Sequence, residues 1–159
     1  MFNERTPDKT FEYISCYDPA VKDDGMSVEE VERYAKTADI SIIKPHLVKG
    51  KTPCRFHLAE VGAADKRYIF GGDLDGEPPE EKNARIDAAI AAIGIRGWDD
   101  PPEGAPPWKT RKVGFRTLVS EEILDFLGPE VGAEIAAVLW IRTLEADKAP
   151  SLEEDVEKN

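Results

Sequence analysis

The sequence predicts an α+β fold, in which a small, mainly antiparallel sheet from the N-terminal half packs against about three helices. Two stretches of the first half, 10–17 and 54–61, alternate in polarity as half-buried strands do. The later stretches 78–94 and 120–144 instead repeat apolar residues at helical spacing. We therefore expect one domain over residues 10–144, after a polar arm at 1–9 and before an acidic, mobile tail at 145–159.

Composition and charge restrict the class of protein. The 159 residues are 41% hydrophobic and carry a net charge of −11, which disfavours binding to nucleic acid and to anionic membranes. Two cysteines are too few for a disulfide framework, so a reducing compartment is expected. The longest apolar run, 131–141, is too short to span a membrane and contains Glu134. The N-terminus has no apolar signal region.

The first half is expected to supply the sheet and one helix. Residues 10–17 form a strand, and Ser27 with Glu30 makes a capping box that starts a short amphipathic helix. Residues 40–48 are rich in β-branched residues but contain Pro45, which indicates an edge strand or a broken one.

The next elements lead into the central helix. Cys54–Val61 is expected to be a strand, and Arg67–Phe70 is either a second short strand or a helix end. Pro78 and Pro79 suit a helix start, and Gly94 is expected to turn left-handed and stop the helix. Trp98, four residues later, is predicted to be a buried aromatic anchor.

The last part of the chain is expected to hold a loop and two helices. Residues 99–107 lack residues of the kind that form a core, and this predicts an extended surface loop. Ser120 caps a helix that ends at Gly128, and Pro129 begins a second helix that runs to about Leu144.

The sequence predicts no metal, cofactor or catalytic residue. Cys54 and His57 have a spacing found among metal ligands, but residues three apart in a strand point to opposite faces. Residues 71–82 resemble a calcium loop without its first and last carboxylates. No phosphate-binding loop, dinucleotide fingerprint or nucleophile elbow is present, and we therefore expect a protein that is not an enzyme.

One basic segment, Trp108–Arg116, interrupts this acidic chain, and we call it the basic island. Cations and aromatics alternate in it, which suits a nucleic-acid backbone, an acidic protein surface, or a plain strand whose cations balance the chain's own acids. The overall charge favours the last two interpretations. The candidate protein interface consists of Trp108, Lys109, Arg111, Lys112, Phe115 and Arg116.

The order of segments from Cys54 to Leu144 resembles small accessory proteins encoded among the structural genes of tailed bacteriophages. The resemblance lies in the strand CRFHLAEV, the corner GIRGW at 94–98 and the closing helices SEEILDFL and PEVGAEIAAVLWIRTL. Ile95 stands where that family more often has leucine, Leu127-Gly128-Pro129 replaces its usual leucine-proline, and residues 1–50 have no counterpart.

The resemblance implies a non-enzymatic structural or assembly module of a virion, without catalytic residues. Its partners would be other virion proteins of the capsid, connector or tail, with homo-oligomer formation as an option and no role for nucleic acid or membrane. It would be found in the virion, or in the host cytoplasm during assembly. The alternative is a soluble acidic inhibitor that presents carboxylates to a host protein's nucleic-acid-binding site.

Overall fold

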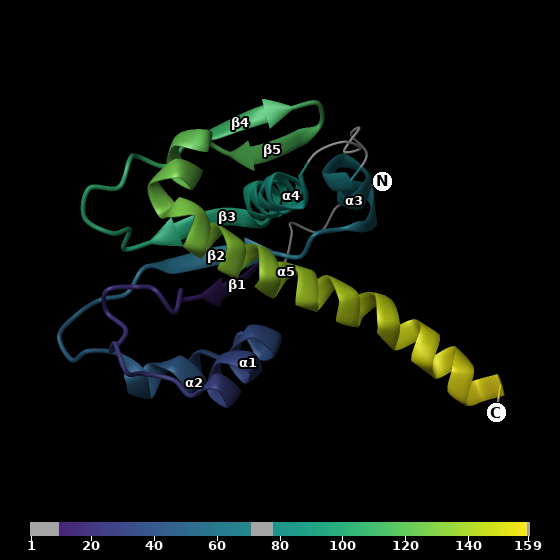
Figure 1. Ribbon diagram of the computed structural model, residues 1–159, viewed down its shortest axis with the longest axis horizontal. Helices are drawn as coiled ribbons and strands as arrows, with labels where there is room; N and C mark the ends of the chain where they lie inside the picture. Colours follow the sequence, from purple (N-terminus) through teal and green to yellow (C-terminus); the bar gives the residue numbers. More distant parts are fainter. Residues whose placement is uncertain (1–9, 71–77, 159) are drawn as a thin grey trace, which may run out of the picture.

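The computed structural model describes residues 10–70 and 78–158, with the side chains of Ala63 and of residues 144–158 left aside. It confirms the α+β class, with a three-stranded and a two-stranded antiparallel sheet surrounded by helices (Figure 1). The strands are β1 (Thr10–Tyr13), β2 (Arg55–Ala59), β3 (Ile95–Asp99), β4 (Thr110–Val113) and β5 (Arg116–Val119). The helices are α1 (Val28–Thr37), α2 (Ile40–Ile43), the 3-10 turn η1 (Lys44–His46), α3 (Ala63–Phe70), α4 (Pro79–Gly94) and α5 (Glu121–Lys158).

The larger sheet has the order β1-β2-β3, and both pairings are antiparallel. Along β1, Tyr13 donates a hydrogen bond to Glu134 of α5, and Phe11 lies under the guanidinium of Arg142 of α5 at 4.0 Å. One face of the sheet therefore packs on α5. Because successive side chains of a strand alternate, Glu12 and its cross-strand partner His57 lie on the opposite face.

The helix α4 packs along α5, and Gly94 permits their close approach. A Cβ atom at Gly94 would lie 2.2 Å from Cδ1 of Leu139, so no larger residue fits without movement. The predicted left-handed turn at Gly94 is wrong, because its φ is not positive and Ile95 continues in an extended conformation directly into β3. Packing, and not backbone conformation, explains this glycine. Trp98 is half-buried and contacts Phe56 and Trp108.

Two sequence predictions for the N-terminal part need correction. The first strand ends at Tyr13, because the Ile14 amide donates to the hydroxyl of Tyr34 and the Cys16 amide donates to Glu134, and neither continues a ladder. The strand predicted at 40–48 is wrong. That segment forms α2 and η1, since Asp39 caps the first turn and Pro45 stands at the start of the 3-10 turn, where no backbone donor is needed.

Other predicted boundaries agree with the structure. The capping box at Ser27 is present, β2 shows the alternating burial, and Arg67–Phe70 is a helix end. Gly128 interrupts α5 with φ +84°, which confirms the joint between two helical segments.

The C-terminal helix extends further than the sequence predicts. It continues to Lys158, beyond the expected end near Leu144, and its last turns project away from the rest of the molecule (Figure 1). The mobility of residues 145–159 stays a prediction. The arm at 1–9 and most of the calcium-like stretch at 71–82 lie outside the described residues. Within the described part, no helix has the length and apolar character that crossing a membrane requires.

Candidate functional site

The basic island leads into the hairpin β4–β5 and supplies β4, the two-residue loop of Gly114 and Phe115, and the first residue of β5. Gly114 has φ +63°, the left-handed conformation that two-residue hairpins of the type II′ class need at their first loop position. Phe115 at the second position has a relative exposure of 105%, so its ring contacts solvent on all sides. The fold thus holds a fully exposed aromatic side chain at the turn of a hairpin whose second strand is packed in the core.

Two of the six candidate residues attach the hairpin to the body. The indole of Trp108 is half-buried and lies edge-on to Trp98, with ring centroids 5.7 Å apart. Arg116 Nε donates to Asp65 at 3.0 Å, and its guanidinium lies 5.0 Å from the ring centre of Tyr68. These contacts fix both ends of the hairpin in place.

The other candidate residues face solvent. Lys109 and Lys112 are exposed and have no ion-pair partner in the described part of the chain. Arg111 makes one long contact, 3.6 Å to Glu121, with both side chains well exposed, and such a pair contributes little to stability. The hairpin, together with Lys109 directly before it, therefore presents an exposed phenylalanine and three exposed cations, two of which have no ion-pair partner among the described residues.

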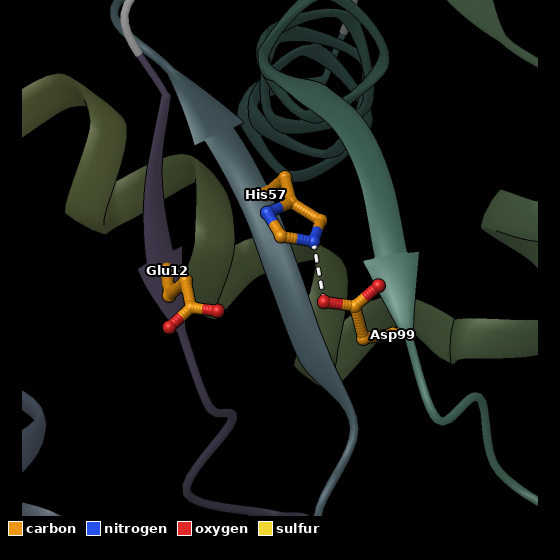
Figure 2. A group of neighbouring side chains, drawn as sticks. All are labelled: Glu12, His57 and Asp99. Atoms are coloured by element: carbon orange, nitrogen blue, oxygen red, sulfur yellow. Dashed lines mark hydrogen bonds and ion pairs between the residues drawn. The ribbon is translucent and has the colours of Figure 1, made fainter.

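A second polar group lies on the sheet face turned away from α5 (Figure 2). His57 of β2 contacts Asp99 of β3, with Nε2 and Oδ2 2.9 Å apart. Glu12 of β1 stands opposite His57, and one donor atom of each of these three residues lies within 4.8 Å of the other two. We call these three residues the sheet-face cluster.

Arg55 supplies the balancing charge beside this cluster. Its guanidinium lies 3.4 Å from a carboxylate oxygen of Glu12, 3.6 Å from Asp99 and 3.7 Å from Asp100. Within the described residues, the imidazole of His57 has no hydrogen bond other than that to Asp99, so no serine or cysteine is placed as a nucleophile beside it.

Neither cysteine is activated. Burial, and to a smaller extent the charge of Glu134, raises the pKa of Cys16 to about 12. Burial also raises the pKa of Cys54 to about 12, with smaller contributions from nearby aspartates. Since the thiolate is the reactive form, both side chains remain protonated and unreactive near neutral pH.

A groove of about 600 Å³ lies between α4 and α5, and half of its lining residues are alanine or glycine. Its polar residues are Glu80, Asn83, Asp87 and Asp125. Partial burial raises the pKa of Asp87, but no histidine, cysteine, serine or lysine lines the groove beside these carboxylates.

Comparisons of the chain with protein-family models, with curated proteins and with solved structures gave no match. The site therefore has to be argued from this chain's own residues. Four of the six interface candidates predicted from the sequence, Arg111, Lys112, Phe115 and Arg116, lie on one hairpin, and Trp108 and Lys109 directly precede it. Sequence reasoning considered His57 as a metal ligand beside Cys54 and rejected that pair, and it missed Glu12 and Asp99, which only the strand register brings to His57.

Proposed function

We propose that this chain is a non-enzymatic structural or assembly module of a tailed-phage particle, and that it binds other virion proteins through the basic hairpin. Phe115 carries the proposal. A phenylalanine gains about 1.5–3 kcal/mol from burial, and at a relative exposure of 105% it gains none of this within the monomer. A partner that covers the ring would recover that free energy.

The chemistry of the hairpin favours a protein partner. Aromatic residues and arginine are enriched at the centres of protein interfaces, and here Phe115 and Arg111 stand on one small projection. The net charge of −11 opposes approach to DNA, because the three exposed cations offset only part of the repulsion. An acidic or mixed protein surface has a lower density of negative charge than DNA, so the repulsion that these cations have to offset is smaller.

The assignment to a phage particle rests on the resemblance of residues 54–144 to accessory proteins of tailed phages. The alternative is an inhibitor that occupies a host protein's nucleic-acid-binding site. Quantitative mass spectrometry of purified virions separates the two functions: a structural module is present at a fixed number of copies per particle. Its absence from virions and from their assembly intermediates would contradict the proposal.

The hairpin's part in this function is tested by charge reversal. We expect Arg111→Glu with Lys112→Glu to fold normally, because both side chains are exposed, and to lose incorporation into particles. A matched control is Lys49→Glu with Lys51→Glu, which makes the same change in net charge at another exposed segment. The control should be incorporated normally. Equal incorporation of both double variants would show that the hairpin is not the contact surface.

A further inference from the structure

We propose that the sheet-face cluster, Glu12, His57 and Asp99, is a binding site for a divalent transition-metal ion, with zinc as the ion that fits best. This site is independent of the hairpin and of the proposed assembly function.

The three donors are of the right kind and are nearly in place. Zinc binds imidazole nitrogen and carboxylate oxygen at about 2.0–2.2 Å, so the donors of a tetrahedral site lie about 3.4 Å apart. In this protein Nε2 of His57 and Oδ2 of Asp99 are 2.9 Å apart, and a Glu12 donor lies within 4.8 Å of both. The side chain of Glu12 is 41% exposed, so it can rotate and bring its carboxylate oxygen to the distance from the other two donor atoms that zinc requires.

The strands hold this arrangement more rigidly than a loop would. Glu12 pairs directly with His57 across β1 and β2, and Asp99 follows two positions after Gly97, the partner of His57 on β3. Gly97 adds no side chain beside the imidazole, since even a Cβ there would touch His57 at 3.5 Å. The fourth coordination position faces solvent, because all three side chains are between 31% and 46% exposed.

The local charge favours a cation. Three carboxylates, those of Glu12, Asp99 and Asp100, share the single guanidinium of Arg55. With His57 neutral, the group keeps an excess of two negative charges, which one divalent ion neutralises. The mixed nitrogen and oxygen donors suit zinc better than calcium or magnesium, which prefer oxygen ligands alone.

Arg55 sets the strength of the site. Its guanidinium lies 3.4–3.6 Å from the same two carboxylates that would bind the metal, so metal and guanidinium compete. We therefore expect moderate affinity in the wild-type protein. We also expect Arg55→Gln, which removes the competing charge, to bind zinc more tightly.

Zinc titration of the full chain in competition with a chromophoric chelator tests the proposal. We expect one zinc ion per chain and a loss of affinity of at least about tenfold in His57→Gln, equivalent to about 1.4 kcal/mol. The chain offers a matched control, His46→Gln, because His46 also contacts one carboxylate, Glu30 at 3.0 Å, but has no place in the cluster. The control should bind zinc as the wild type does. Cobalt(II) in place of zinc should give visible absorption of a tetrahedral site, and this absorption should disappear in His57→Gln.

Three results would overturn the site: equal zinc affinity of wild type and His57→Gln, an equal loss in His46→Gln, or Arg55→Gln binding no more tightly than wild type. Circular dichroism checks that each variant is folded. Should His57→Gln fail to fold, Asp99→Asn takes its place with the same expected loss, since Asp99 is 46% exposed and stands at the end of its strand.

Discussion

The polar groups around Glu134 are hydrogen-bonded inside the protein, whereas most of those around the basic hairpin face solvent. Glu134 accepts hydrogen bonds from the hydroxyl of Tyr13 at 2.6 Å, the hydroxyl of Ser15 at 2.5 Å and the amide of Cys16 at 2.8 Å. On the hairpin, Lys109 and Lys112 have no partner among the described residues. The carboxylate of Glu134 therefore contributes to the stability of the fold, whereas the two lysines make no ion pair that would do so.

This contrast extends to the aromatic residues of the two regions. Tyr13 stacks on Tyr34 with ring centroids 4.9 Å apart, and both side chains are buried. Phe115 touches nothing. Substitutions at the first region should therefore change the free energy of unfolding, whereas those at the second should change binding alone. The predictions below test this separation, beginning with the largest expected effect on stability.

Glu134→Ala should destabilise the protein by about 3–5 kcal/mol. The substitution removes three hydrogen bonds to a charged acceptor, each contributing about 1.5–3 kcal/mol, and leaves the Tyr13 hydroxyl without an acceptor inside the protein. Urea unfolding of the two proteins measures the difference. Glu130→Ala on the same helix is the control, and should change stability by less than about 0.5 kcal/mol because Glu130 is exposed. Similar results for both variants would show that the Glu134 contacts are not stabilising.

Gly94→Ala should cost about 1–3 kcal/mol through overpacking, because the new methyl group would lie 2.2 Å from Cδ1 of Leu139. Gly132→Ala is a matched control within α5, since a Cβ there meets nothing within 4 Å. That control should stabilise the helix by up to about 1 kcal/mol. The melting temperatures of the two variants should move in opposite directions from that of the wild type. A shift in the same direction would contradict the packing role of Gly94.

Alkaline pH should weaken the fold. Burial raises the pKa of Cys54 from 9.0 to about 12, so the folded state keeps a proton that the unfolded state has lost. The contribution of this thiol is therefore complete below about pH 9 and is lost as pH rises toward 12. We expect the free energy of unfolding to fall by about 1–3 kcal/mol between about pH 9 and 11. Cys54→Ala should reduce this pH dependence, and an unchanged slope would assign it to other groups, such as Cys16.

The sequence predicted local structure well and long-range contacts poorly. The capping box at Ser27 and the joint at Gly128 depend on neighbouring residues, whose chemistry the sequence displays directly. The strand predicted at 40–48 was wrong. The β-branched residues there suggested a strand, whereas the cap at Asp39 and the position of Pro45 favour a helical turn.

The contacts that the sequence did not reveal join residues far apart in the chain. In the sequence, Glu134 is only a charged residue within an apolar run. Its partners Tyr13 and Ser15 lie at the end of β1 and just after it, more than a hundred residues away. Likewise, the sheet-face cluster depends on the register of three strands, and a shift of one residue would move Glu12 to the opposite face. The basic island could be recognised because its residues are consecutive, but the hairpin turn at Gly114 and the structural roles of Trp108 and Arg116 could not.

The smallest effect on stability is expected for Phe115→Ser, and this variant tests the separation most directly. Because the ring is 105% exposed and follows a glycine that sets the turn, its removal should change the free energy of unfolding by less than about 0.5 kcal/mol. Incorporation into particles should nevertheless be lost, since the partner would no longer cover an aromatic ring. Val28→Ser is the control, an apolar residue that is 74% exposed on α1 and should leave incorporation unchanged. If Phe115→Ser is destabilised, the ring contributes to the stability of the fold. If the variant is stable and is incorporated normally, the hairpin tip does not contact the partner.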